Sequence, residues 1–497
     1  MHEAAGTAKL IARRGAAVAD VAFRLSQPDR RNYGSPAACT ERDETADNRA
    51  KIIFDKLRVG AQKTGALVSV FARRIAQRTM TWIGAAFSNF LSRFLELQLA
   101  KTEQVHRVVL RLADRASATA MRSFTPIKSE VDVKRDLRLD FFRGLALLII
   151  FVDHIPGNFL SNITLHSIAF SDATEVFVFV SGYAAALAYG SILIGNGFFA
   201  AMLRIYRRVW QLYIAHIFIF IVLVAVISHV SMVHWKVNAG EFRLAEFIKE
   251  PQVALVQAIL LQFQPQFLDI LPLYIVLLAI FPAVLFLIAR HPLLALVPSA
   301  SIYVLTQSLG WEVHGYPGNH VWFFNPLAWQ FLFVVGAVLA YPHGPGTRWI
   351  PKDPLLITSA TTVTALAAVT NISWVVHFNY SEVPGIFLNL LGPYAGDKTN
   401  LGPLRLLSFL ALAVTTVHFM RPDSRLLRGR ASAWLIACGQ NSLHVFCLGI
   451  LLSVIAYFIL VIFDGGVPIQ VAVDLAGCAL MIGLARLMSW CKAENRC

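Results

Sequence analysis

The amino-acid sequence carries little charge for its length. Only 15% of its 497 residues are Asp, Glu, Lys or Arg, whereas 56% are hydrophobic. A soluble domain has charge on about a quarter of its residues, because its outward-facing helices must meet water. The apolar residues of this chain fall in long blocks rather than in short periodic stripes. This pattern excludes an ordinary soluble enzyme and indicates a membrane protein with several transmembrane helices.

Several other signals are missing. The six cysteines form no CxxC motif and no cluster with histidine, so we predict neither a disulfide framework nor a metal site. The first residues, MHEAAGTAKLIARRG, contain no apolar segment like that of a signal peptide, and we expect the first transmembrane helix to direct insertion. The net charge is +14, but the basic residues form no recognisable binding motif, so we predict no nucleic-acid partner.

Ten apolar blocks follow from about residue 139, and each is close to the ~20 residues that a transmembrane helix needs. The chain shows no internal repeat of the kind that builds many transporters. We therefore predict an all-α fold, a polytopic transmembrane helix bundle of about ten spans. The blocks cover residues 139–156, 173–193, 209–230, 268–289, 293–308, 326–341, 355–373, 404–420, 437–462 and 469–488.

A basic region precedes the first block. Residues 1–133 contain 22 Lys and Arg against 13 Asp and Glu. Residues 1–60 are polar, and we predict that they are largely disordered. Residues 64–122 look helical and amphipathic, which fits either a helix lying on the membrane or a soluble helical hairpin. We divide the chain into a basic cytoplasmic extension over 1–133 and a ten-span membrane domain over 134–497.

The loops between the blocks differ in positive charge. If the first block begins in the cytoplasm, the inner loops hold 12 Lys and Arg and the outer loops hold 4. Cytoplasmic loops of membrane proteins are the richer in Lys and Arg, so we predict that both termini are cytoplasmic. The inner residues are Arg204, Arg207, Arg208, Arg290, Arg348, Lys352, Arg421, Arg425, Arg428, Arg430, Lys492 and Arg496, and the outer residues are Lys236, Arg243, Lys249 and Lys398.

The first block, RDLRLDFFRGLALLIIFVDHIPGN, has ionisable residues at both ends. Arg143 and His154 are about 16 Å apart along a helix, so they lie near opposite membrane faces and do not touch. His154 can take a proton from an alcohol, which makes it our candidate general base, although a role as helix C-cap explains it equally. Arg143 is either a contact for an anionic donor or a surface anchor. We add Asp140 and Asp153 as candidate substrate contacts. Adjacent residues diverge on a helix, so we expect a carboxylate other than Asp153 to orient the imidazole.

Asp172 and Glu175 begin the second block, in SDATEVFVFVSGY. They are three positions apart, so they share a helix face, and they lie on the same outer side as His154. Either residue can orient the imidazole or bind a sugar hydroxyl, and both also fit as caps of a helix N-terminus. We count both as candidate catalytic residues. Ser181 lacks the context of a nucleophile elbow, so we interpret Ser181-Gly182-Tyr183 as close helix packing.

Further polar residues gather at the ends of the blocks and are our candidate substrate contacts. Arg204, Arg207 and Arg208 form an inner basic cluster that suits phosphate groups, and the positive-inside rule explains them equally. Aromatic residues with amides near the outer ends are typical of carbohydrate contact and also of an interfacial aromatic belt. The remaining candidates are Asp269, Tyr274, Asn325, Gln330, Lys398, Asn400, Arg405, Asn441 and His444.

Several motifs together resemble the OpgC family, whose members are implicated in succinyl modification of osmoregulated periplasmic glucans. They are RLDFFRGLALLIIFVDHIPGN, DATEVFVFVSGY, FLDILPLYIVLL, FNPLAWQF, NLGPLRLL and GQNSLHVFC, and the resemblance spans roughly residues 134–490. The family is similar to the broader acyltransferase-3 group, in which an Arg, ten intervening residues and a His mark the first span. Arg143 and His154 match that pattern. Where many members of the group have a WSLSVEEQFY-like segment, this chain has FLDILPLY without the Glu, so no role is carried over from it.

The resemblance implies an O-acyltransferase of the bacterial inner membrane. It implies succinyl-CoA as the co-substrate, with no bound cofactor, and a periplasmic glucan as the acceptor, with the lipid bilayer as the surrounding partner. It also strengthens His154 as the catalytic base. Two other functions stay open: a transporter or flippase for a glycan or acyl donor, and a non-catalytic accessory subunit of glucan synthesis.

Overall fold

The computed structural model describes residues 136–234, 239–318, 320–341, 353–379, 390–392, 396–422 and 424–494. These residues belong to the second of two compact units, Pro126–Cys497. The expectations for residues 1–133 lie outside the described part of the chain. Within that part every regular element is a helix, and the only β-type pairings are two isolated bridges.

Nine of the ten predicted apolar blocks each coincide with one helix, and the tenth, 437–462, covers all of one helix and the end of another. Seven of these helices are long and apolar enough to cross a membrane, α11 and α14 are shorter apolar helices, and the 17-residue α3 belongs to neither group. The chain is therefore an all-helical, multi-pass membrane protein. The ten helices are α3 (Leu137–Asp153), α5 (Ala173–Asn196), α6 (Phe198–Val233), α9 (Ile270–Arg290), α10 (Pro292–Leu309), α11 (Pro326–Ala340), α12 (Pro354–Asn379), α14 (Pro403–Phe419), α16 (Ser442–Ile462) and α17 (Val467–Glu494).

The structure also contains short helices that the sequence analysis does not predict. One group, η1 and α4, connects α3 to α5, and a second group connects α6 to α9. The block predicted over 437–462 contains parts of two helices, because the helix is interrupted at Asn441, between α15 and α16. The short helices are η1 (Phe159–Ile163), α4 (Leu165–Ile168), η2 (Ala239–Phe242), α7 (Ala245–Lys249), α8 (Pro251–Ile259), η4 (Arg425–Arg428) and α15 (Arg430–Gln440).

Local sequence explains where many of these helices begin and end. Proline occupies the first turn of α8, α10, α11 and α14, where its missing N–H leaves no helical bond unmade. The Asn325 side chain caps α11 by accepting from the Leu327 N–H at 3.1 Å. Gly310 ends α10 with a φ of 64°, a left-handed conformation that glycine adopts without strain.

Glycines allow two pairs of helices to pack with their backbones in contact. A methyl group at Gly182 of α5 would collide with the Phe333 carbonyl of α11, and one at Gly336 of α11 would collide with the Phe179 carbonyl of α5. The same reciprocal arrangement joins α3 to α15 through Gly144 and Gly439. The first pair confirms the interpretation of Ser181-Gly182-Tyr183 as close helix packing.

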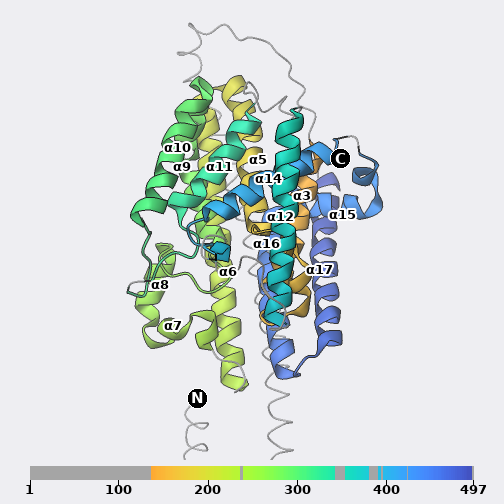
Figure 1. The fold of residues 1–497 in the computed structure, drawn as a ribbon. Helices are drawn as coiled ribbons and strands as arrows, with labels where there is room; N and C mark the ends of the chain where they lie inside the picture. The colour runs from red at the N-terminus through yellow and green to blue at the C-terminus, as the bar shows by residue number, and fades with distance from the viewer. Residues whose placement is uncertain are drawn as a thin grey trace, which may run out of the picture. The chain divides into compact units, whose positions relative to one another are not determined.

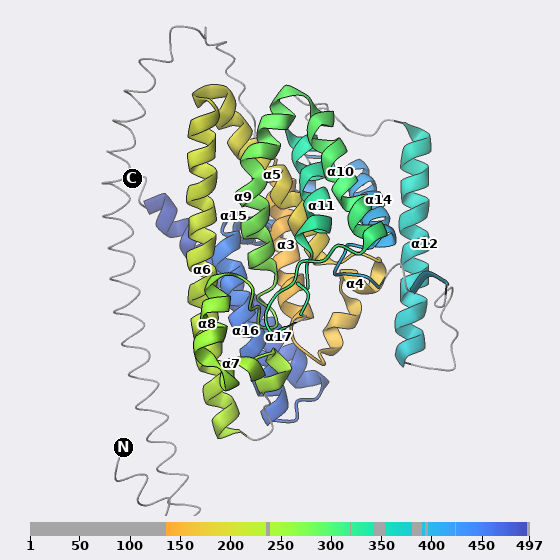
Figure 2. The same ribbon diagram turned by 90° about the vertical axis from the view of Figure 1, so that its left-hand side faces the viewer.

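The helices form a bundle with two ends, at which the connecting segments lie. Figure 1 shows α9, α10 and α11 grouped together, with α7 and α8 beside the lower part of α6. Figure 2 shows α12 at the edge of the bundle, and α12 packs against α4 and α14. We call the end at which α3 finishes and α5, α9, α11 and α14 begin the site end, and the other the opposite end.

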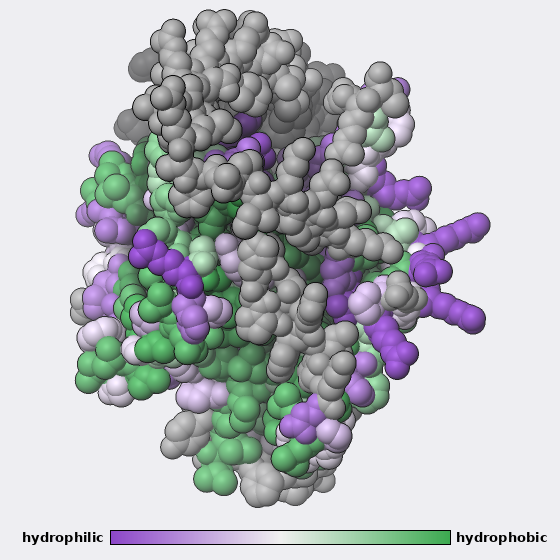
Figure 3. Space-filling view, turned by 90° about the horizontal axis from the view of Figure 1, so that it is seen from above, coloured by the Kyte–Doolittle hydropathy of each residue, from purple (hydrophilic) through white to green (hydrophobic). Residues whose placement is uncertain are grey.

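The opposite end is basic on its α15 side. Figure 3, which looks down on it, shows hydrophilic side chains projecting on the side where α15 lies in Figure 1. In the loop before α15 and at its start, Arg421, Arg425, Arg428 and Arg430 are exposed. These four arginines are among the residues that the sequence analysis assigns to inner loops.

Candidate functional site

The site is built on the N-terminus of α5. Asp172 caps this helix by accepting from the Thr174 N–H at 2.7 Å, and Glu175 accepts from the Asp172 N–H at 2.8 Å, which completes a capping box. The capping role that the sequence allowed is therefore present for both carboxylates. It consumes one oxygen of each and leaves the others free to bind cations.

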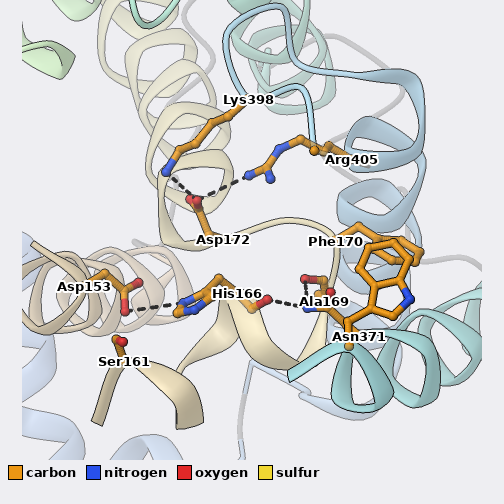
Figure 4. Close-up of a pocket in the computed structure, with 11 residues that line it drawn as sticks. Asp153, Ser161, His166, Ala169, Phe170, Asp172, Asn371, Lys398 and Arg405 are labelled. Carbon is orange, nitrogen blue, oxygen red and sulfur yellow. Dashed lines mark hydrogen bonds and ion pairs between the residues drawn. The ribbon is translucent and has the colours of Figure 1, made fainter. Parts of the chain in front are cut away.

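Two cations from the α14 region bind these carboxylates (Figure 4 shows the contacts to Asp172). The Lys398 ammonium lies 2.6 Å from Asp172 Oδ2, and Arg405 Nη2 lies 3.2 Å from the same oxygen. Arg405 also contacts Glu175 Oε1 with Nε at 2.8 Å and with Nη2 at 2.6 Å. The sequence named all four residues as site candidates, and the structure brings them together from segments more than 200 positions apart.

The charge state of Asp172 follows from this arrangement. Burial by itself raises the pKa of a carboxyl group, because it disfavours the charged form. The positive charges of Lys398 and Arg405 outweigh burial and hold the pKa of Asp172 well below its usual value. Asp172 is therefore an anion at neutral pH. It serves as a fixed counter-charge and not as a proton acceptor.

Lys398 lies in a loop that α10 and α11 hold in place. The Trp329 indole Nε1 donates to the carbonyl oxygens of Lys398 and Thr399, each at 3.1 Å, and the Asn325 N–H donates to Thr399 O at 3.0 Å. The Tyr303 hydroxyl donates to Leu401 O at 2.8 Å. The FNPLAW segment therefore determines where the Lys398 side chain begins.

His154 directly follows the last residue of α3, near this cluster. Its Nδ1 lies 2.6 Å from Ile150 O, and its ring packs against Phe267 with centroids 5.2 Å apart. A carbonyl oxygen can only accept, so Nδ1 carries the hydrogen and Nε2 keeps its lone pair. The imidazole is close enough to Lys398, Asp153 and Asp172 to interact electrostatically with their charges. The expectation that a carboxylate orients this ring is wrong, because a main-chain carbonyl of the same helix is close enough to do it.

Asp269 reaches the same region from the start of α9. Its carboxylate is buried, and Oδ1 has no hydrogen-bond partner among the described residues. Arg243 Nη1 lies 4.0 Å away and donates to His320 Nε2 at 3.3 Å. Partial burial and the charge of Arg243 lower the pKa of His320, so this imidazole is neutral at pH 7. Arg243 and Lys398 both act on the Asp269 carboxylate, which places Asp269 in the same electrostatic cluster.

A pocket of about 440 Å³ adjoins the cluster (Figure 4). It lies among the end of α3, α4, α12 and the Lys398 loop, and it shares Asp172, Lys398 and Arg405 with the ion cluster. Its lining residues are Asp153, Ser161, His166, Ala169, Phe170, Asp172, Asn371, Trp374, Gly396, Lys398 and Arg405. His154 does not line this pocket, but its neighbour Asp153 does.

Four of the predicted substrate contacts use their amides inside the protein. Asn325 Nδ2 donates to Asn400 Oδ1 at 2.9 Å, and Gln330 exchanges hydrogen bonds with Ser299 of α10. Asn441 donates to Ala485 O at 3.1 Å and accepts from the Lys492 ammonium at 2.6 Å. Asn325, Gln330 and Asn400 thus shape the site end, and Asn441 joins α15, α16 and α17 at the opposite end.

The structure also places some candidates away from the ion cluster. In the part of α3 nearer the opposite end, Asp140 is buried, and Arg143 Nη2 donates to Val180 O of α5 at 3.0 Å. Tyr274, on α9, packs against Phe177 at 6.2 Å. At the opposite end, Arg204, Arg207 and His444 are exposed. Arg208 is partly buried there, and its charge interacts electrostatically with His444.

Sequence reasoning missed several residues of the site. His166 and Trp374 line the pocket, Phe267 packs on His154, and Trp329 holds the Lys398 loop. Trp329 stands inside the quoted FNPLAW segment, so its signal was available. Within the described residues, no group of three or more His, Cys, Asp or Glu side chains is arranged to hold a metal ion.

Comparison with known proteins then identifies the family. A model of the OpgC protein family matches residues 135–493, which include every helix described above except the last residue of α17. Neither the curated proteins nor the solved structures contain a match to this chain. The chain therefore belongs to the OpgC family of membrane proteins, which is associated with succinylation of periplasmic glucans.

Proposed function

We propose that this protein is an O-acyltransferase of the bacterial inner membrane, which transfers a succinyl group from cytosolic succinyl-CoA to a hydroxyl group of a periplasmic glucan. The observation that carries the proposal is the state of His154. Its Nδ1–H is bound to Ile150 O, its Nε2 is free to accept a proton, and its ring lies within the field of the Lys398 ammonium. An imidazole in that tautomer, beside a cation, suits acyl transfer to an alcohol.

The ten helices support a matching topology. In this proposal all ten cross the membrane, both termini are cytoplasmic, and the site end faces the periplasm. The short helices α11 and α14 are counted among the ten, and most of α11 is buried against its neighbours. The basic opposite end then faces the cytoplasm and its anionic lipids, as the positive-inside rule requires.

The donor enters from the opposite end. Its phosphate groups bind near Arg204, Arg207 and Arg208, since guanidinium groups match phosphate oxygens. The acyl arm then runs between α3, α5 and α9, past Arg143 and Tyr274, until the thioester reaches His154. Arg143 already bridges α3 and α5 through its bond to Val180 O, so it is placed to contact an arm lying between those helices.

The chemistry balances as a direct transfer. The acceptor hydroxyl oxygen attacks the thioester carbonyl carbon while its proton passes to His154 Nε2. The tetrahedral oxyanion is stabilised by the Lys398 ammonium, which Asp172 and the Trp329-bound loop hold in place. The C–S bond then breaks, His154 returns the proton to the leaving thiolate, and the products are free CoA and an anionic glucan ester.

The test compares His154→Ala and His154→Gln with the wild type at equal membrane abundance. We expect loss of succinyl groups from the glucan by mass spectrometry in both variants, because neither retains a basic ring nitrogen. His314→Ala, a change at an exposed loop histidine, is the matched control and keeps full succinylation. Purified protein in lipid discs must also transfer the acyl group by itself, which a transporter or an accessory subunit would not do. Unchanged succinylation in His154→Ala contradicts the proposal.

A further inference from the structure

The 440 Å³ pocket has a polar wall whose hydrogen bonds are directed. The Thr164 hydroxyl donates to Asp153 Oδ1 at 2.7 Å, so it accepts from His166 Nδ1, which lies 2.8 Å away. His166 Nδ1 therefore carries a hydrogen, and in the neutral ring Nε2 keeps a lone pair. The His166 side chain is 41% exposed and lines the pocket, so this wall offers acceptors to a ligand that brings hydroxyl donors.

A second wall is aromatic. The rings of Phe170 and Trp374 lie 5.3 Å apart at an angle of 42°, and both residues line the pocket. Asn371, one helical turn before Trp374, fixes α12 against this wall by donating to Ala169 O at 2.9 Å and to His166 O. The C–H faces of a pyranose ring are apolar and its rim carries hydroxyls, so such a ring fits between an aromatic wall and a wall of acceptors.

The formal charges around the pocket balance. Lys398 and Arg405 contribute two positive charges, and Asp153 and Asp172 contribute two negative charges. The two cations are already bound to Asp172, and Arg405 is bound to Glu175 as well. The pocket lining therefore has no net positive charge to attract a phosphate or a carboxylate, and a neutral ligand fits it better than an anionic one.

The pocket also lies next to the surroundings of His154, the proposed base. Asp153 is the residue before His154, and Lys398 both lines the pocket and acts on the His154 imidazole. A ligand between Phe170, Trp374 and His166 thus lies beside two residues that also neighbour the proposed base.

From these walls we infer that the pocket is the acceptor subsite and binds an unmodified, neutral glucosyl residue, with Trp374 under the sugar ring and His166 accepting from a hydroxyl. This inference rests on the proposed function for its meaning, but the binding that it predicts needs no acyl donor. His166 and Trp374 bind and position the sugar in this scheme, and the proton still passes to His154.

The experiment measures binding of a neutral β-linked gluco-oligosaccharide to the full-length protein in lipid discs, without any acyl donor, by calorimetry. We expect His166→Ala to weaken binding about fivefold to tenfold, the effect of one lost hydrogen bond, and Trp374→Leu to weaken it further. Trp490→Leu, at an exposed position near the end of α17, is the control and binds as the wild type does. Trp374→Phe keeps a ring and retains most of the affinity. The same oligosaccharide carrying a succinyl ester binds more weakly to the wild type.

Two results separate this inference from the proposed function. If His166→Ala and Trp374→Leu are folded and bind the oligosaccharide as tightly as the wild type does, the subsite lies elsewhere, even where acyl transfer is intact. If Trp374→Leu does not fold, His166→Ala decides alone, because His166 lies on a short, exposed helix. If binding depends on both residues but purified protein transfers no acyl group, the subsite stands and the transfer mechanism fails.

Discussion

Replacing Arg405 by methionine leaves two buried carboxylates without their shared cation. The Arg405 guanidinium contacts Glu175 through two nitrogens and Asp172 through one. The Glu175 side chain is 0% exposed, and those of Asp172 and Arg405 are each 10% exposed, so water cannot replace the lost contacts. Methionine fills much of the same space, so the change in stability reports charge rather than packing.

The size of the effect follows from burial. Removing one partner of a buried ion pair costs about 3–5 kcal/mol, because the other charge stays in a low-dielectric site. Asp172 keeps Lys398 at 2.6 Å, so most of the cost falls on Glu175. At about 2 °C for each kcal/mol, the value for larger domains, we expect the unfolding midpoint to fall by roughly 6–10 °C.

The assay is thermal unfolding of purified protein in detergent micelles at about pH 8.5, where both α5 carboxylates are ionised in the wild type. Arg430→Met is the control, since Arg430 is exposed at the start of α15 and its loss changes stability by about 0.5 kcal/mol or less. The double variant Arg405→Met with Glu175→Gln removes both charges and recovers much of the lost stability, because the remaining amide needs no cation.

Two outcomes would refute this reasoning. The first is an Arg405→Met protein as stable as the Arg430→Met control. The second is a double variant no more stable than Arg405→Met, which means that Glu175 is not left as an uncompensated charge. In either case Arg405 has another role than balancing the α5 carboxylates.

Three further predictions concern other parts of the structure. Trp329→Phe removes the indole donor to the Lys398 loop and lowers stability by about 1–3 kcal/mol. Acyl transfer falls by more than the unfolded fraction of the variant explains. A fall in acyl transfer that only matches the unfolded fraction would contradict the positioning role. Gly439→Ala forces a methyl group against the α3 backbone and costs about 1–3 kcal/mol, whereas Gly483→Ala meets open space and stabilises by about 0.5–1 kcal/mol; melting curves of the two compare them directly. Asp172 has a depressed pKa, so its stabilising effect is present above the unfolded pKa of about 3.9 and is lost as pH falls through the folded value. Lys398→Met raises that folded pKa toward the unfolded value, so the variant loses less stability than the wild type as the pH falls from about 5 to about 3, and parallel pH profiles would refute this.

Hydrophobic length was enough to predict the ten helices, because a lipid-exposed helix must be apolar over its whole span. The same signal could not show that the first residues of block 437–462 belong to a separate helix, α15. Asn441 breaks the chain there, and the break depends on bonds to Ala485 and Lys492 from α17, which no local pattern reveals. The short helices between α6 and α9 escaped for a similar reason, since they are too short for periodicity to show.

The sequence was enough to predict which residues belong to the site, but not which of them contact each other. Ionisable residues near membrane depth are few, so Asp172, Glu175 and Arg405 stood out by chemistry. Their pairing joins α5 to α14, and one sequence holds no record of which distant carboxylate meets which cation. His166 escaped because it lies in a short connecting helix, where a polar residue is ordinary. The assignment of a carboxylate to orient His154 failed because main-chain carbonyls are present at every position and carry no sequence signal.

The loop that carries Lys398 is held mainly by its backbone. The hydrogen bonds that Trp329, Asn325 and Tyr303 donate to residues 398, 399 and 401 all end on main-chain carbonyl oxygens. Exchanging the Lys398 side chain therefore leaves these supports in place. Position 398 is consequently a natural point for engineering: a shorter, longer or neutral group there changes the charge presented to an acyl donor on an otherwise unaltered scaffold, so donor preference becomes adjustable by a single substitution.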